Sequence, residues 1–353
     1  MTYKNNKLIY FTLVLIVTLS TVVIAQTSIN QSEVYAKAQQ SYYDLIKKLN
    51  IPIIEIDLDK YNIETLEPKI IIDPNKEVEG AKYYLATTFS MLAHRDTLFI
   101  VDTRQNTILV SSFDGKIIKT IGREGSGPGE FRNPYCMIEN KSYYFIFDQR
   151  NGRIQILNKK FKYVKSLPMS FLPGSRNIAA NNSQLLINEK NSVPYEVTSY
   201  SLKNLALTKS DFIDKRFTFD LDLQKNNNRL YSMYIDASSD KYIAAVCSLV
   251  PYIFIFDNNG KPVYSIKYKS KKITELMQNN KAGSFWRLVN GINIKNNILF
   301  VHLHKKMFSF DMQKKSINKV YSLENIDSDT FTIYEKNLFL SFMDKVYRTD
   351  INY

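Results

Sequence analysis

The chain has 353 residues and a formal charge of +13, and 44% of its residues are hydrophobic and 13% aromatic. This length allows several average domains but also suits one large all-β domain. With 11 Gly and 2 Cys, the composition excludes a collagen-like chain and a disulfide-rich scaffold. The excess of positive charge would suit an acidic partner, such as an anionic glycan or a membrane surface. The lysines are dispersed, however, and we interpret them as solvated surface charge.

An export signal is predicted at the N-terminus. Lys4 and Lys7 precede an uncharged apolar run over residues 8–25, which ends on small residues. With Val23 and Ala25 as the small residues at positions −3 and −1, this layout predicts a signal peptide over residues 1–25, cleaved before Gln26. An uncleaved anchor is the alternative, because the apolar run is long for a signal peptide. We therefore expect a periplasmic, cell-surface or secreted protein with no membrane span after cleavage and no nucleic-acid partner.

The two cysteines, Cys136 and Cys247, both lie in apolar, strand-like runs. Export would permit a disulfide between them. Their apolar surroundings favour two buried free thiols instead. No Cys-x-x-Cys pair or Cys/His cluster predicts a zinc site.

Residues 26–50 are predicted to form an N-terminal helical segment. Apolar residues recur at intervals of three and four from Val34 to Leu49. Ser32 can cap the first turn, and Pro52 ends the pattern. We expect this helix to pack against the domain that follows.

From residue 51 onward, a unit of short strands and polar turns recurs. The apolar residue before an Asp- or Asn-rich turn marks each unit, and successive marks lie about 39 to 54 residues apart. The marks are Phe113, Leu157, Leu202, Phe256, Phe310 and Thr349. Four short strands occupy about 40–50 residues in a propeller blade. The pattern predicts an all-β, six-bladed β-propeller of four-stranded antiparallel blades over residues 51–353, with inserted loops near 215–229 and 271–283.

The last unit offers three strands, over residues 330–334, 337–342 and 345–350. A blade of three strands leaves a bare edge, which favours aggregation. Two surplus β-like segments precede the first unit, at residues 53–58 and 69–73. One of them is expected to complete blade 6 and thereby close the ring.

The segments Gly122–Phe131 and Asp148–Gln155 resemble an NHL repeat, with its G-x-G-x-G-P-G-x-F loop and its D-x-x-N-x-R-I-Q strands. Over about residues 97–167 the chain is similar to secreted six-bladed propellers related to NHL-repeat proteins. Glycine permits positive φ in such a loop, and we expect Phe131 to insert between blades. Arg153 is expected to bind backbone carbonyls or a nearby acid. No strand enters and no helix follows the glycines, which excludes a phosphate loop.

Histidines and acidic or amide side chains are the ligand types that zinc and calcium prefer. His94, His302 and His304 are all the histidines of the chain, and a His₃ zinc site would need each of them. The strand order places His94 on the opposite face of the disc from the other two, so no zinc site is expected.

An alternative calcium site would consist of Glu139, Asp236 and Asn290, which lie near the expected ends of inner strands. Related propellers serve as lactonases, lyases and hydrolases, usually through a metal near the central channel. The resemblance therefore implies a metal-dependent hydrolase or lyase as the alternative function, with Ca²⁺ as its cofactor.

Trp286 and Arg287, on an expected inner strand, are the candidate binding residues, since Trp and Arg are common in binding hot spots and in sugar stacking. Packing between blades is the alternative role for Trp286. No nucleophile elbow or informative Ser/His arrangement is found, so the catalytic residues, if any, are unknown. We expect a monomeric, exported binding module without a cofactor or catalysis, for a glycan, peptide or protein partner.

Overall fold

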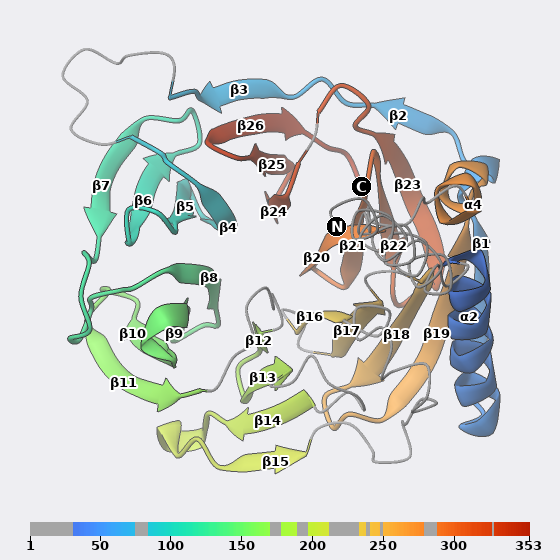
Figure 1. The fold of residues 1–353 in the computed structure, drawn as a ribbon, viewed down its shortest axis with the longest axis horizontal. Helices are drawn as coiled ribbons and strands as arrows, with labels where there is room; N and C mark the ends of the chain where they lie inside the picture. The colour runs from blue at the N-terminus through green and yellow to red at the C-terminus, as the bar shows by residue number, and fades with distance from the viewer. Residues whose placement is uncertain are drawn as a thin grey trace, which may run out of the picture.

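The computed structural model describes residues 31–74, 84–169, 178–188, 197–211, 233–237, 241–247, 250–278, 288–326 and 328–353. The strands of these segments form six sheets, which are arranged as a ring (Figure 1). Successive inner strands contact one another around the ring, and the inner strand of the last sheet contacts that of the first. The predicted six-bladed, all-β propeller is confirmed.

Blades 1 to 3 are four-stranded antiparallel sheets that follow the chain from the channel to the rim (Figure 1). Blade 1 contains β4 (Thr88–His94), β5 (Thr97–Asp102), β6 (Thr107–Ser112) and β7 (Ile117–Ile121). Blade 2 contains β8 (Pro134–Glu139), β9 (Tyr143–Asp148), β10 (Arg153–Asn158) and β11 (Tyr163–Pro168). Blade 3 contains β12 (Ile178–Ala180), β13 (Gln184–Asn188), β14 (Val197–Ser201) and β15 (Lys209–Asp211).

Blades 4 to 6 each include one strand from the N-terminal segment. Blade 4 contains β16 (Met233–Asp236), β17 (Tyr242–Cys247), β18 (Tyr252–Asp257), β19 (Pro262–Lys269) and β1 (Ile53–Asp57). Blade 5 contains β20 (Val289–Lys295), β21 (Ile298–Leu303), β22 (Lys306–Asp311), β23 (Ser316–Ser322) and β2 (Ile63–Thr65). Blade 6 contains β24 (Thr330–Tyr334), β25 (Asn337–Phe342), β26 (Lys345–Asp350) and β3 (Lys69–Ile72).

The ring is closed by β3, which pairs antiparallel with β26 as the fourth strand of blade 6. Of the two segments considered for this role, residues 69–73 supply the strand and residues 53–58 do not. Instead, β1 pairs parallel with β19, and β2 pairs parallel with β23. Blades 4 and 5 therefore have five strands rather than the expected four. The outer edge of a blade offers free backbone N–H and C=O groups, so an extended segment that follows the rim pairs with each edge that it passes.

The predicted N-terminal helix is α2 (Gln31–Lys48), which lies outside blade 4 (Figure 1). Tyr42 of this helix is fully buried. Its ring is stacked on Tyr252, with 5.5 Å between the ring centroids, and lies 6.0 Å from the ring of Phe254. The helix thus fixes the N-terminal segment to the ring before β1 begins.

A second helix, α4 (Lys271–Gln278), occupies most of the stretch that we expected to be an inserted loop at residues 271–283. Its start has a local cause, because the hydroxyl of Ser270 accepts the backbone N–H of Ile273 at 3.2 Å. The other expected insertion, at residues 215–229, lies outside the described residues.

The predicted signal peptide, residues 1–25, also lies outside the described residues. Within the described part of the chain, no helix combines the length and apolar character needed to cross a bilayer.

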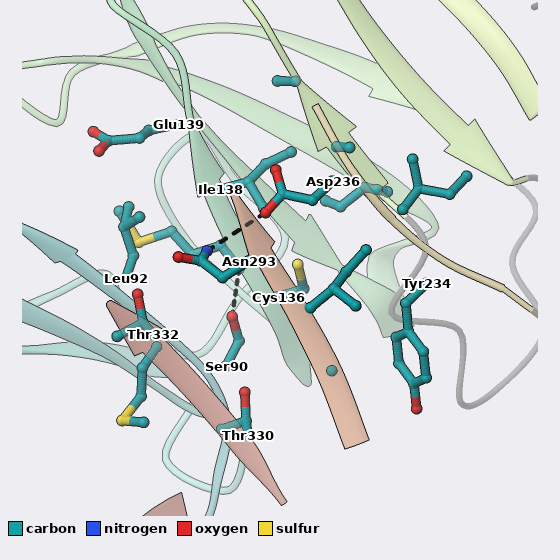
Figure 2. Close-up of a pocket in the computed structure, with 18 of the residues that line it drawn as sticks. Ser90, Leu92, Cys136, Ile138, Glu139, Tyr234, Asp236, Asn293, Thr330 and Thr332 are labelled. Carbon is teal, nitrogen blue, oxygen red and sulfur yellow. Dashed lines mark hydrogen bonds between the residues drawn. The ribbon is translucent and has the colours of Figure 1, made fainter. Parts of the chain in front are cut away.

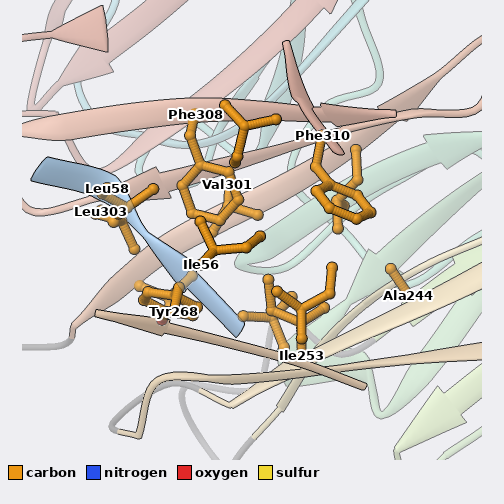
Figure 3. Packing of buried hydrophobic residues seen from close by; sticks show 14 of the residues in the cluster. Ile56, Leu58, Ala244, Ile253, Tyr268, Val301, Leu303, Phe308 and Phe310 are labelled. Atoms are coloured by element: carbon orange, nitrogen blue, oxygen red, sulfur yellow. The ribbon is translucent and has the colours of Figure 1, made fainter. Parts of the chain in front are cut away.

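In the described part of the chain, the hydrophobic core consists of six clusters, each between two consecutive blades. Figure 3 shows one such cluster, which contains Ile253 of blade 4 and Val301 and Phe308 of blade 5, together with Ile56 and Leu58 of the N-terminal segment. Because both faces of a blade are covered by its neighbours, its middle strands are continuous apolar runs rather than alternating ones. Both cysteines are buried free thiols, as expected.

The loop between blades 1 and 2 has the architecture that its glycines predict. Phe131 is fully buried between these two blades. Gly122 has a φ of +80°, and a Cβ at this position would lie 2.2 Å from the Phe131 ring. Only glycine therefore allows the ring to lie so close to this turn of the backbone.

Candidate functional site

A cavity of about 370 Å³ occupies the central channel. All six inner strands, β4, β8, β12, β16, β20 and β24, contribute to its wall. Its polar lining consists of Ser90, His94, Glu139, Asn140, Lys141, Lys159, Asn181, Asn182, Asp236, Asn290, Asn293, Lys295, Thr330 and Thr332. The volume lies at the small end of the range for ligand sites, so the cavity suits a small ligand or one residue of a larger one.

Several of these polar groups join neighbouring blades. The hydroxyl of Ser90 accepts the backbone N–H of Met137 at 3.3 Å, which links blades 1 and 2 (Figure 2). The amide of Asn290 donates to the carbonyl of Ser328 at 3.0 Å, which links blade 5 to the chain entering blade 6. Such contacts fix the inner strands relative to one another, so the wall of the cavity is preformed.

Asp236 joins blade 4 to blade 5 at the cavity wall. Its Oδ2 accepts the backbone N–H of Ile294 at 3.0 Å. It also accepts the amide of Asn293 at 3.5 Å (Figure 2). The carboxylate is therefore held by donors from the next blade. The Oδ1 atom of Asn293 is buried and accepts no hydrogen bond from any residue that the structure describes.

Glu139, at the end of β8, lies between two basic groups. Its Oε1 is 2.8 Å from Nδ1 of His94, and its Oε2 is 2.6 Å from Nζ of Lys159. The side chains of His94 and Glu139 are 34% and 17% exposed, so both remain accessible from the cavity. Lys159 also lies 4.0 Å from the centroid of the Tyr144 ring, and burial raises the pKa of Tyr144 to about 12. The tyrosine therefore stays neutral near neutral pH, and a cation–π contact helps to position Lys159.

Asn140 and Asn181 occupy equivalent positions in blades 2 and 3, directly after the inner strand. The amide oxygen of each accepts two backbone N–H groups of the following turn. The amide nitrogen of Asn140 donates to the carbonyl of Asn181 at 3.1 Å. The amide nitrogen of Asn181, by contrast, is buried and has no hydrogen-bond partner among the described residues. Among the described residues, the wall thus contains a buried unused donor at Asn181 and a buried unused acceptor at Asn293.

The three residues of the alternative calcium set, Glu139, Asp236 and Asn290, all line this cavity. Each is already engaged, however: Glu139 by two basic side chains, Asp236 by the adjacent blade and Asn290 by a carbonyl group. In the described part of the chain, no group of three or more His, Cys, Asp or Glu residues could hold a metal ion. As arranged, the set does not fit Ca²⁺ without an exchange of partners.

The histidines do not come together in one site. His94 ends the inner strand of blade 1 and lines the cavity. His302 is fully buried near the end of β21, where its Nε2 lies 3.1 Å from the hydroxyl of Ser328. His304 follows the same strand. His94 therefore belongs to blade 1, whereas His302 and His304 belong to blade 5.

The two candidate binding residues, Trp286 and Arg287, lie outside the described residues. The structure adds residues that the sequence did not point to, namely Lys159 beside Glu139 and the amides of Asn181 and Asn293. The contact between His94 and Glu139 joins two blades, and these residues are 45 positions apart in the chain. No local motif signals such contacts.

A family model described as "6-bladed beta-propeller" (DUF5128) matches residues 88–284, more than half of the chain. The chain belongs to this family. The match begins at the first residue of β4 and covers blades 1 to 4 of this six-bladed β-propeller.

Two solved structures share the fold at low sequence identity. A candidate exported protein from Bacteroides fragilis has a TM-score of 0.53 and 13% identity, with 82% of this chain and 88% of that chain covered. Virginiamycin B lyase from Staphylococcus aureus has a TM-score of 0.51 and 11% identity, with 82% and 99% covered. The chain matches none of the curated proteins. These similarities concern the architecture alone. The second of these two proteins is an enzyme, a lyase.

Proposed function

We propose that this six-bladed β-propeller is an exported binding module that holds its ligand in the cavity of the central channel. The observation that carries the proposal is a preformed cavity of about 370 Å³ with contributions from all six inner strands. Its lining combines amides, hydroxyls and charged groups with apolar side chains, which is the usual composition of a ligand site. A rigid ring keeps these groups in place without the ligand, which lowers the cost of ordering on binding.

Export is supported by the N-terminal layout, in which Lys4 and Lys7 precede the apolar run over residues 8–25. The expected product begins at Gln26. Mass spectrometry of the mature protein from its own cell envelope would test this directly. An intact N-terminus would instead indicate a retained anchor.

Binding in the cavity is testable with a variant that blocks it. Lys295 lines the cavity, and no hydrogen bond or ion pair of its side chain is found among the described residues. Lys295→Trp should therefore fill the cavity without breaking a contact of the fold. Lys314→Trp is the matched control, at a lysine in the turn between β22 and β23 of the same blade whose side chain is 77% exposed and lies 3.7 Å from Asp311.

Saturation-transfer NMR would be recorded on the full chain with three classes of probe: neutral monosaccharides, uronates and tripeptides. The proposal predicts that at least one class binds the unmodified protein and the Lys314→Trp variant but not the Lys295→Trp variant. Absence of binding by all three classes, or binding that Lys295→Trp leaves unchanged, would contradict it.

The second candidate function is a hydrolase or lyase, and the observation in its favour is the His94–Glu139 pair. A histidine bonded to a carboxylate can accept or donate a proton at a ligand. If the enzyme used Ca²⁺, Glu139 would have to exchange Lys159 or His94 for the ion. Stoichiometric Ca²⁺ or Zn²⁺ in the purified protein, with a rise in melting temperature on addition of either, would favour this function over simple binding.

A further inference from the structure

We propose that the ligand of the channel cavity is a small hydroxylated anion of the sugar-acid class. This inference rests on the proposed function, which places the ligand in this cavity. Three features of the cavity wall favour such a ligand: its charge, its unused amide groups, and its shape and size.

The charged residues around the cavity are more often basic than acidic. Its lining contains three lysines, Lys141, Lys159 and Lys295, against two carboxylates, Glu139 and Asp236. Both carboxylates are engaged, since Glu139 binds Lys159 and Asp236 accepts hydrogen bonds from blade 5. The wall therefore has a net positive charge, which favours an anionic group on the ligand.

Lys295 is the group that would recognise this anion. It ends β20, is partly exposed and lines the cavity. In the described part of the chain its ammonium group forms no hydrogen bond or ion pair. A carboxylate is a suitable partner for it, because charge-assisted hydrogen bonds are shorter and stronger than neutral ones.

Two amide atoms beside the cavity are not used in the hydrogen bonds of the described fold. The donor of Asn181 and the acceptor of Asn293 are buried beside the cavity without partners among the described residues. A buried polar atom without a hydrogen bond is costly, so such atoms are rare unless something else completes them. A hydroxyl group both donates and accepts, so a ligand with several hydroxyls can serve both amides.

The shape of the site also favours a sugar ring. Asn181 lies on blade 3 and Asn293 on blade 5, so the groups are distributed around the channel rather than along one groove. A sugar ring presents hydroxyls around its whole circumference, and its C–H faces suit the apolar lining that includes Leu92 and Phe331. A cavity of about 370 Å³ is large enough for one such ring.

The test is isothermal titration calorimetry of the full chain at low salt with three probes: glucuronate, glucose and acetate. Glucuronate should bind at least about tenfold more tightly than glucose, because it alone reaches both Lys295 and the amides. Acetate should compete poorly, since it offers a carboxylate without hydroxyls.

Two variants assign the parts of the site. Lys295→Met should weaken glucuronate binding about tenfold and leave glucose binding unchanged. Asn293→Leu should weaken both sugars about tenfold, while Asp236 keeps its contact with Ile294. Lys314→Met, at the exposed lysine between β22 and β23, should change neither. Melting curves would show whether each variant is folded, and Lys295→Met has no described contact to lose.

Equal binding of glucuronate and glucose, competition by acetate as strong as by glucuronate, or no effect of Lys295→Met would each overturn the assignment. Binding of tripeptides alone, blocked by Lys295→Trp, would overturn the sugar-acid assignment while leaving the cavity as the ligand site. Failure of every probe would contradict the proposed function as well.

Discussion

Arg153 fixes the loop between blades 1 and 2 through both kinds of partner expected for it. Its guanidinium group donates to the carbonyls of Gly127 and Glu130 at 2.9 and 3.1 Å. Its Nε lies 2.8 Å from Oδ2 of Asp148, whose side chain is fully buried. The motif that resembles an NHL repeat thus has an architectural role in this protein.

Replacement of Arg153 by Met should lower the free energy of unfolding by about 3–5 kcal/mol, because it leaves the buried carboxylate of Asp148 without its cationic partner. Arg123→Met is the matched control, since Arg123 is 80% exposed beside Glu130 and should contribute less than about 1 kcal/mol. Urea denaturation of both variants would measure the difference. Similar losses for the two would show that Asp148 does not depend on Arg153.

Buried tyrosines make the fold sensitive to alkaline pH. Burial raises the pKa of Tyr144 and Tyr321 to about 12, and also raises those of Tyr252, Tyr264 and Tyr268. Below pH about 10 these phenols are neutral in both the folded and the unfolded chain. Above it the unfolded chain ionises first, so the stability should be lost progressively from pH about 10 to about 12. Urea denaturation across this range would measure the loss, and a constant stability would contradict it.

At the scale of single residues, the sequence could predict part of the site. Glu139, Asp236 and Asn290 were placed near the ends of inner strands, and all three do line the cavity. Their contacts could not be predicted, because His94 lies 45 residues from Glu139 and meets it only when blades 1 and 2 pack together. The sequence also could not predict that the amide nitrogen of Asn140 has a hydrogen-bond partner while that of the equivalent Asn181 has none among the described residues.

At the scale of elements, the N-terminal segment binds the outer edges of three successive blades with β1, β2 and β3. The sequence indicated that one strand must close the ring but could not choose between residues 53–58 and 69–73. Both are short, apolar β-like runs, and the choice depends on the path of the segment around the rim. The extra strands on blades 4 and 5 have the same origin.

The position of β3 leads to a prediction for the turn of blade 1. Gly115 has a φ of +92°, and a Cβ there would lie 1.9 Å from the carbonyl oxygen of Ile71 in β3. Gly129 has a φ of +76° with open space around it. Gly129→Ala should therefore cost about 1–2 kcal/mol from backbone strain alone, whereas Gly115→Ala should also displace the closing strand.

We expect Gly115→Ala to destabilise the protein by at least about 2 kcal/mol more than Gly129→Ala. Thermal or urea denaturation of the two variants would measure the difference. Equal losses would indicate that β3 does not lie against this turn.

At the scale of the whole molecule, the fold could be predicted because every blade buries both of its faces. The six hydrophobic clusters lie between blades, so each blade needs a similar set of apolar strands. This need produces the repeat that marks the blades in the sequence. The polar residues that face the channel need not repeat from blade to blade, because they do not pack between blades. The sequence repeat therefore does not mark the ligand site, which is visible only in the structure.

Amide hydrogen exchange with and without glucuronate tests most directly whether the ring encloses the ligand. The channel-facing edge of each inner strand pairs with no other strand in the described sheets, so amides there should exchange readily unless a ligand covers them. The account predicts slower exchange in β12 and β20, with the rim strands and the N-terminal strands β1 to β3 unchanged. Protection confined to the rim strands, or no protection in any inner strand, would contradict it.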